Sequence, residues 1–558
     1  MDSQMRFNIA ERRLRYHAAP EITLFDKDFL IGFNHRHKTV LANYELQLDS
    51  GGIIPIGERI NNRSNLGALR NRQLRESVIL AAALAAAAVA LRGRNSLSAY
   101  PPEKQTPALI NDLKRNNDRT AAQVMAEVLQ TTTETLPVGE EVLIESTITE
   151  GARAKPGKEP GGNPTIAVGA LFGKKEHRIR YGLPMPEHVA LLSMGSDVIE
   201  GTTKSVKGLH SSLTALFLTE SGVKRHLPDV YVQRWMAGVP FEEFNPREAS
   251  LLDAAEIIID AYGLSSADRL SAFFLDRKRH YPAMDILNNA GVITPFDYDG
   301  DLFPSLVLGI EDLQFADGRR LLAMIGEIGG SAEWAVGVLP LVWRGGQAIG
   351  MLTSQSALTR DNIDSLRLWK ERFHFTEEEF IVIQDARFEQ KPYFTIHDIL
   401  ERPFAGGISA FGSITDNCYL PYLEGVRIDA ESGEVGVNVF VINSMGICEV
   451  WRMVFSCNTD INRTKALFAC PKDSLALLSG PHLERALGEL LAEENSAKRF
   501  RLFFNNEYYS AIIPIRDKLV LLDGVIKSLI AREALTEKDS EIISITRRLA
   551  PDWFVGYD

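Results

Sequence analysis

The chain has 558 residues, of which 45% are hydrophobic and 24% are charged, as in a folded globular protein rather than a disordered one. This length accommodates two to four domains of ordinary size. The 61 basic and 73 acidic side chains give a formal net charge of −12, which argues against nucleic acid or an anionic membrane as the main partner.

The cysteines and the N-terminal residues indicate a cytoplasmic protein. None of the four cysteines lies in a CxxC pair or at zinc-finger spacing from a histidine, so they are expected to be buried thiols in a reducing compartment. The N-terminus is charged and lacks a signal-peptide core. The longest apolar run, residues 78–91, is too short to span a bilayer and is mostly alanine, which predicts a tightly packed core helix.

In chain order, residues 1–70 contain β-like pieces such as EITLFDKDFLIGF and predict an N-terminal extension. Helices are expected over about 74–91 and 120–130, and strands over 142–146, 165–172 and 188–194. The segment 150–164, rich in glycine, proline and lysine, is expected to be a loop. These elements predict one domain-sized half, residues 71–245.

From about residue 246 strands and helices alternate. The run LLDAAEIIIDAYG predicts a helix ended by Gly263, RLSAFFLD a strand, AMDILNNAG a second helix and VITPFDYDG the start of another strand. Such alternation is typical of an α/β layer with partly parallel strands, whose ligands bind at the carboxyl ends of the strands. Residues 246–460, β-rich after about 405, are expected to form a second half, and residues 461–558 an additional α+β region.

The stretch MGSDVIEGTTKSVKG, residues 194–208, places two acids near a glycine and two threonines. Asp197 and Glu200 can offer oxygen ligands to a hard cation such as Mg²⁺. Gly201 allows close approach of the backbone, and Thr203 lies where a helix start would favour a phosphate. The same residues would equally suit a capping turn with two exposed acids.

Six short motifs occur in the order found in one phosphatase family. DVIEGTT resembles the DPIEGT signature of the lithium-sensitive, metal-dependent phosphatase superfamily, and more narrowly of class II, GlpX-type fructose-1,6-bisphosphatase. VLIESTITEG, DVYVQRW, FLDRKRHYPAMDILNNAGV, FDYDGDL and IGEIGGSAEW resemble further segments of that family. The resemblance covers roughly residues 74–355 and implies an α/β fold of layered α-β-α-β sugar-phosphatase type.

Carried over residue by residue, the resemblance implies a metal site and a sugar-phosphate site. It implies Mg²⁺ or Mn²⁺ held by Glu145, Asp197, Glu200 and Glu333, with Thr202 beside the scissile phosphate and the attacking water. The residues expected to hold the substrate are Gly201, Thr203, Tyr231, Arg277, Arg279, Asp299 and Asp301. Arg277 and Arg279 can clamp a remote phosphate, although a solvated RKRH face is the commoner meaning of such a run.

The chain departs from the family pattern at the groups that activate water. The family has an aspartate where this chain has Thr149, and Glu150 is the adjacent acid that would replace it. An RGDKNTAD stretch of the family is missing, and Asp112 or Asp118 is expected to supply its acid. Losing a positioned general base costs about 10²–10⁴ in rate. Trp334 also replaces a glycine beside Glu333.

Three functional hypotheses follow. The first is an enzyme, a metal-dependent phosphatase of carbohydrate metabolism that hydrolyses a sugar phosphate or bisphosphate and forms a homo-oligomer. The second is a catalytically degenerate relative that binds sugar phosphates as a regulatory or assembly subunit, with the unmatched terminal regions binding a protein partner. The third is another enzyme on the same scaffold. None of them involves nucleic acid or a membrane.

Overall fold

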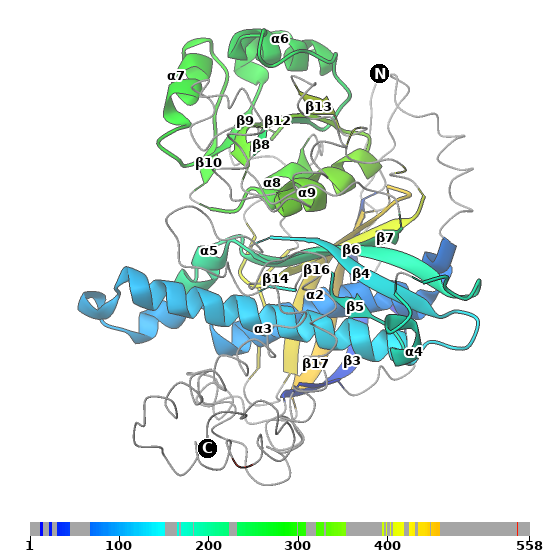
Figure 1. Ribbon diagram of the computed structural model, residues 1–558. Helices are drawn as coiled ribbons and strands as arrows, with labels where there is room; N and C mark the ends of the chain where they lie inside the picture. Colours follow the sequence, from blue (N-terminus) through cyan, green and yellow to red (C-terminus); the bar gives the residue numbers. More distant parts are fainter. Residues whose placement is uncertain are drawn as a thin grey trace, which may run out of the picture.

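The described part of the chain forms two mixed β-sheets with helices packed on them (Figure 1). This computed structural model describes residues 12–14, 22–24, 31–44, 67–150, 165–166, 169–181, 183–221, 232–297, 299–308, 320–328, 331–352, 393–395, 398, 402, 405–417, 423–429, 434–446, 448–457 and 544. The expected α+β region at 461–558 lies outside these residues, apart from Ser544.

The first sheet has 11 strands and combines distant parts of the sequence. Its order is β1-β3-β17-β16-β14-β7-β6-β4-β5, with β2 paired to β3 and β15 to β16. Only β4 and β6 among these strands pair in parallel. The strands are β1 (Arg12–Leu14), β2 (Ile22–Leu24), β3 (Ile31–Tyr44), β4 (Val142–Thr149), β5 (Leu171–Phe172), β6 (Ala190–Glu200), β7 (Leu213–Glu220), β14 (Gly407–Ser413), β15 (Arg427–Ile428), β16 (Glu434–Asn443) and β17 (Cys448–Cys457).

The second sheet has six strands in the order β10-β9-β11-β8-β12-β13. Strand β9 runs parallel to β10 and β11, whereas β8 is antiparallel to both of its neighbours. The strands are β8 (Val232–Ala237), β9 (Ala272–Leu275), β10 (Phe296–Asp297), β11 (Ala323–Ile328), β12 (Gln347–Leu352) and β13 (Phe394–Thr395). Since β8 belongs to this sheet and β14, β16 and β17 belong to the first, the expected boundary at residue 245 does not coincide with the division between the sheets.

Helices form layers below, between and above the two sheets (Figure 1). Helices α2 (Arg72–Arg92) and α3 (Pro107–Glu134) pack on one face of the first sheet. Helix α9 (Ser331–Trp343) contacts strands of both sheets and packs against α8 (Leu302–Val307), so these two helices lie between them. Helices α6 (Leu251–Ala261) and α7 (Tyr281–Asn289) cover the outer face of the second sheet. The expected mixed α/β class is confirmed.

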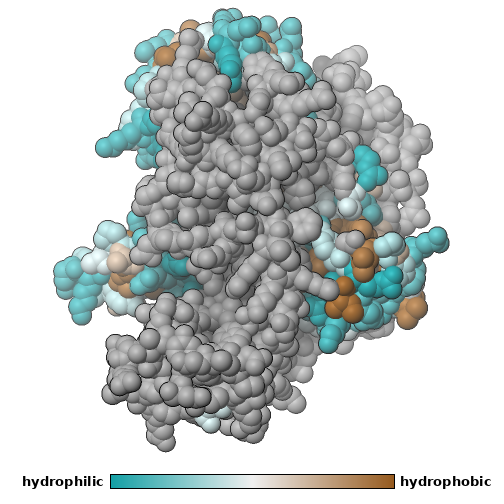
Figure 2. Space-filling view, viewed as in Figure 1, coloured by the Kyte–Doolittle hydropathy of each residue, from teal (hydrophilic) through white to brown (hydrophobic). Residues whose placement is uncertain are grey.

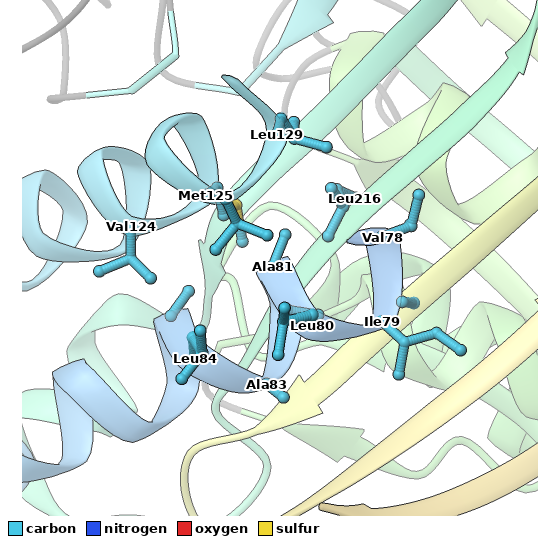
Figure 3. Packing of buried hydrophobic residues seen from close by; sticks show 14 of the residues in the cluster. Val78, Ile79, Leu80, Ala81, Ala83, Leu84, Val124, Met125, Leu129 and Leu216 are labelled. Carbon is cyan, nitrogen blue, oxygen red and sulfur yellow. The ribbon is translucent and has the colours of Figure 1, made fainter. Parts of the chain in front are cut away.

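Helix α2 is buried on all sides because its alanines let both neighbours approach closely. Residues 77–91 are buried, and Val78, Ile79 and Leu84 belong to one buried hydrophobic cluster with Met125 and Leu129 of α3 (Figure 3). This is the one described helix long and apolar enough to cross a membrane by length and composition, and 89% of its apolar window is buried inside the protein. The expected core helix is therefore confirmed.

The remaining helical segments are short. They are α4 (Lys175–Arg178), α5 (Thr202–Lys207) and the 3₁₀ turns η1 (Gly67–Arg70), η2 (Ser96–Ala99), η3 (Pro102–Lys104) and η4 (Ala267–Arg269). The side chains of Ile179 and Leu183, which follow α4, are exposed, as is that of Leu191 in β6. Figure 2 shows hydrophobic residues among hydrophilic ones on this side of the molecule, at the right of the view.

Two sequence expectations need correction. The strand expected over 165–172 is reduced to β5, because Gly169 adopts a left-handed φ of 85° and its N–H donates to Ser146. The helix expected over 120–130 is much longer. It begins at Pro107, after the N-cap Thr106, and polar residues occupy its first turns.

Candidate active site

A β-bulge in β6 brings Asp197 and Glu200 to the same side of the sheet. In a regular strand, side chains three positions apart point to opposite faces. Asp197 lies opposite Ala215 and Glu200 opposite Leu213, so β6 gains one residue relative to β7 between them. The two carboxyl groups hydrogen-bond to each other. Strand β6 therefore extends through both acids, whereas the strand expected from the sequence covered residues 188–194.

Burial and mutual repulsion keep these two carboxyls from ionising readily. Burial, together with the charge of the neighbouring Asp301, raises the pKa of Glu200 to about 8. Burial also raises the pKa of Asp197 well above its ordinary value, with Glu200 and Glu150 as nearby negative charges. The two acids are not the exposed pair of a capping turn.

Asp118 of α3 joins this pair from the other side of β6. Its Oδ1 accepts a hydrogen bond from the Thr202 hydroxyl at 3.1 Å, and its buried Oδ2 has no hydrogen-bond partner. Burial raises the pKa of Asp118 to about 8, and the charge of Glu150 adds to the shift. The neighbouring Asn117 fixes α3 here, because its amide donates to Ser205 of α5 and to the Gly93 carbonyl.

Glu150 follows the end of β4, which is parallel to β6. The acids at the carboxyl ends of both strands therefore lie on the same side of the molecule. The Glu150 N–H donates to the Ser196 carbonyl at 3.0 Å. The side chain of Glu150 is partly exposed, and its charge raises the pKa of both Asp118 and Asp197. Thr149 is buried, and its hydroxyl interacts with the hydroxyls of Thr165 and Ser196.

A turn after β10 of the second sheet closes over the acids of the first. The Leu302 N–H donates to Glu200 Oε1 at 2.6 Å. Gly300 has a left-handed φ of 84°, and a Cβ there would lie 3.5 Å from the same Glu200 oxygen. Asp301 is buried and forms an ion pair of 3.0 Å with buried Arg234 of β8. Asp301 therefore supports the turn, whereas Asp299, 27% exposed, is accessible to a ligand.

Two arginines follow β9 beside this turn. Arg277 Nη2 lies 3.5 Å from Asp299 Oδ1, and Arg279 is half-buried two residues later. The buried His280 ring holds the segment through a 2.8 Å hydrogen bond between Nδ1 and the Leu275 carbonyl. Burial, together with the charges of the nearby arginines, lowers the pKa of His280 to about 4, so this ring is neutral at pH 7.

Other expected site residues lie elsewhere or outside the described side chains. Glu145 of β4 lies opposite Ser193 of β6. Because Ser193 is four residues before Asp197, Glu145 is displaced from Asp197 by about 13 Å along the strand direction. Its carboxylate accepts a hydrogen bond from Tyr181. Asp112 is exposed on α3, six residues before Asp118, the alternative acid. Glu333 lies in the first turn of α9 with its side chain outside the described part, as is all of Tyr231.

The short helix α5 follows the two acids directly, and it is too short to provide the expected phosphate site at its N-terminus. Gly201 is its N-cap with a left-handed φ of 70°, and Thr203 is buried within it. Helix α5 has only six residues. Sequence reasoning missed Lys204, Asp297 and Arg234, although each lies inside a motif that the sequence singled out. Each of the three is a charged residue within a quoted motif, and this was the signal in the sequence that could have identified it.

The donor set suits a hard cation. It consists of carboxyl oxygens, one of them buried without a partner, in a group whose pKa values are raised by burial and by neighbouring acids. Within the described residues, however, no three or more His, Cys, Asp or Glu side chains are already arranged to hold a metal ion. The reason is visible at Asp197 and Glu200, which hydrogen-bond to each other. A cation would replace that hydrogen bond.

Comparison with known proteins agrees with the motif order. Residues 187–401 match the family model of bacterial fructose-1,6-bisphosphatase, glpX-encoded. The resemblance to the GlpX-type family is confirmed for this segment. It contains Asp197, Glu200, both arginines and the turn after β10, whereas Asp118 and Glu150 precede it.

Two curated relatives carry the same description, D-fructose 1,6-bisphosphatase class 2/sedoheptulose 1,7-bisphosphatase. They come from Synechococcus sp. strains JA-3-3Ab and JA-2-3B'a(2-13). Each is 25% identical to this chain over 243 residues, which is 43% of this chain and 63% of the relative. The chain thus spans less than two thirds of the length of these two relatives.

Proposed function

We propose that this protein is a metal-dependent phosphatase that hydrolyses a phosphomonoester of a sugar phosphate or bisphosphate in the cytoplasm. The observation that carries the proposal is the buried convergence of Asp118, Asp197 and Glu200 beneath the turn that contains Asp299. Three buried acids without a cation would be a costly arrangement, and a divalent ion with a phosphate would resolve it. The GlpX-type relatives, both named as bisphosphatases, support the substrate class.

Asp118, Asp197 and Glu200 are the residues that would hold Mg²⁺ or Mn²⁺, and Glu333 stays a candidate. When bound, such an ion neutralises charge on the phosphoryl oxygens. Glu145 is a weaker candidate because of its distance along β4 and its hydrogen bond to Tyr181.

Of the other side chains, two would act on the attacking water and three would bind the substrate. Thr202, hydrogen-bonded to Asp118, is placed to orient an attacking water, and Glu150 is the partly exposed carboxylate that can accept its proton. Arg277 and Arg279 supply positive charge for a second phosphate. Asp299 can accept hydrogen bonds from sugar hydroxyls, while Asp301 remains paired with Arg234.

The test is phosphate release by the purified full-length chain. Fructose 1,6-bisphosphate and a panel of sugar phosphates are offered with Mn²⁺ or Mg²⁺. Wild type should release phosphate, and Glu200→Gln should lower kcat by at least 10²-fold, because the amide cannot carry the charge that a cation needs. Glu141→Gln is the matched control: Glu141 is also buried, but it lies before β4, about 30 Å from Glu150 along the strand.

A second candidate is a protein that binds sugar phosphates without hydrolysing them. Its supporting observation is Thr149, whose hydroxyl sits in a buried network with Thr165 and Ser196 where an acid was expected. In that case a sugar bisphosphate raises the melting temperature while no phosphate is released. Activity that appears in Thr149→Asp would favour this candidate over the first.

A further inference from the structure

Lys204 and Asp297 form an ion pair that joins the two sheets beside the candidate active site. Lys204 lies in α5, directly after β6 of the first sheet, and Asp297 ends β10 of the second. The distance from Lys204 Nζ to Asp297 Oδ2 is 2.6 Å. The Lys204 side chain is only 3% exposed and that of Asp297 23% exposed. A buried ammonium of this kind is tolerated because a carboxylate compensates for its lost hydration.

The turn between Asp297 and Leu302 passes directly over Lys204 and Glu200. A Cβ on Gly300 would lie 3.4 Å from Lys204 Nζ and 3.5 Å from Glu200 Oε1. The turn, residues 297–302, is thus attached to the first sheet at both ends, by the ion pair at Asp297 and by the Leu302 hydrogen bond to Glu200. Asp299 lies between these attachments, and its side chain is 27% exposed.

Charge explains why the attachment at Asp297 needs a lysine. The turn carries three aspartates and lies against Glu200, whose ionised form is disfavoured by burial and by the charges of Asp301 and Asp299. Like charges at this separation repel, and the repulsion pushes the turn away from the acids. The buried Lys204 ammonium offsets this repulsion, because it pairs with Asp297 at the start of the turn.

We propose that Lys204 and Asp297 are positioning residues that hold the turn 297–302 against the cation-binding carboxylates, so that the sugar and its scissile phosphate are bound in one site. This inference rests on the proposed phosphatase function for its kinetic consequence. Its structural consequence, a turn held by the ion pair, is independent of activity.

The first measurement is amide hydrogen exchange of a peptide covering residues 296–302 in the full-length protein. In Lys204→Met, which keeps the length but removes the charge, exchange should be at least tenfold faster than in wild type. Lys204→Arg should restore it to within threefold. Lys174→Met is the matched control, because it breaks the partly buried Lys174–Glu141 ion pair at the opposite end of β4. It should leave exchange at 296–302 unchanged.

The second measurement separates positioning from general loss of structure. Lys204→Met should raise KM for fructose 1,6-bisphosphate at least tenfold, whereas Mn²⁺ affinity, measured by calorimetry without substrate, should not weaken, because a positive charge has been removed near the acids. Asp297→Asn, on the more exposed partner, should show the same increase in KM and replaces Lys204→Met if that variant does not fold.

The two proposals fail differently. Exchange at 296–302 within threefold of wild type in both Lys204→Met and Asp297→Asn overturns the positioning inference, as does an equal increase in Lys174→Met. A wild-type protein that hydrolyses no sugar phosphate overturns the phosphatase proposal, while the exchange experiment still decides the role of the ion pair.

Discussion

Asp118 and Glu200 each have a pKa of about 8, which links the stability of this protein to pH. A carboxyl group with a raised folded-state pKa binds its proton more tightly in the folded than in the unfolded chain. Between about pH 4, where unfolded carboxyls ionise, and about pH 8, the folded state retains protons that the unfolded chain has lost. The free energy of unfolding of the metal-free protein therefore falls as pH rises through this window.

We accordingly expect Mn²⁺ to stabilise the protein more at pH 8 than at pH 6. At the higher pH the cation binds carboxylates that are already ionised, whereas at the lower pH it must displace protons. Thermal unfolding with and without Mn²⁺ at the two pH values measures the difference. Asp118→Asn should flatten the pH dependence without metal and reduce the Mn²⁺ shift. Equal Mn²⁺ shifts at both pH values would contradict a cation site at these acids.

At the scale of elements, the contact between α2 and the first sheet is unusually close. The Thr214 hydroxyl donates to the Ala82 carbonyl at 2.8 Å, and Gly412 of β14 faces the same carbonyl. A Cβ at Gly412 would lie 2.4 Å from the Ala82 oxygen. The alanine run and this glycine are complementary, because both remove side-chain volume from the contact between helix and sheet.

Gly412→Ala should therefore destabilise the protein by about 1–3 kcal/mol, the usual cost of overpacking a core. Urea unfolding of the purified protein measures the loss. Gly436→Ala is a matched substitution in the same sheet, where the nearest atom to a Cβ is the flexible end of Arg452 at 3.2 Å. It should change the free energy of unfolding far less. Similar losses in both variants would show that the α2 contact is not the cause.

For the whole molecule, the candidate site is assembled from two sheets. The first sheet and the helices packed on it supply Asp118, Asp197 and Glu200, and the segments after β9 and β10 of the second supply Arg277, Arg279 and Asp299. Two contacts that join the two groups are the hydrogen bond from Leu302 to Glu200 and the ion pair between Lys204 and Asp297. A cation and a sugar phosphate would each bind mainly one group while stabilising the contact with the other.

Mn²⁺ and fructose 1,6-bisphosphate should consequently stabilise the protein cooperatively. Together they should raise the melting temperature by more than the sum of their separate shifts, since the first ligand pre-organises the site for the second. Differential scanning fluorimetry with each ligand alone and with both measures the excess. Glu200→Gln should abolish it. Purely additive shifts in wild type would mean that the two ligands bind independent sites.

Local sequence patterns were sufficient to predict several features of this protein. The alanine-rich run, the glycine after α6, the strand–helix alternation and the ordered motifs determined the core helix, the α/β class and the family resemblance. The acids Asp197 and Glu200 were found because they lie within one short motif. Glu150 was predicted to replace a missing family aspartate because it is adjacent to Thr149. Asp118 was one of two candidates for the acid of the missing RGDKNTAD stretch.

Only the tertiary structure decided which acids meet. Asp118 rather than Asp112 reaches the cluster because helical periodicity points it inward, and Glu145 stays apart because strand register places it opposite Ser193. A bulge, set by pairing with β7, turns Asp197 and Glu200 to one side. Lys204 and Asp297 lie 93 residues apart and meet across two sheets. Register and long-range pairing depend on the whole chain, so no local pattern specifies them.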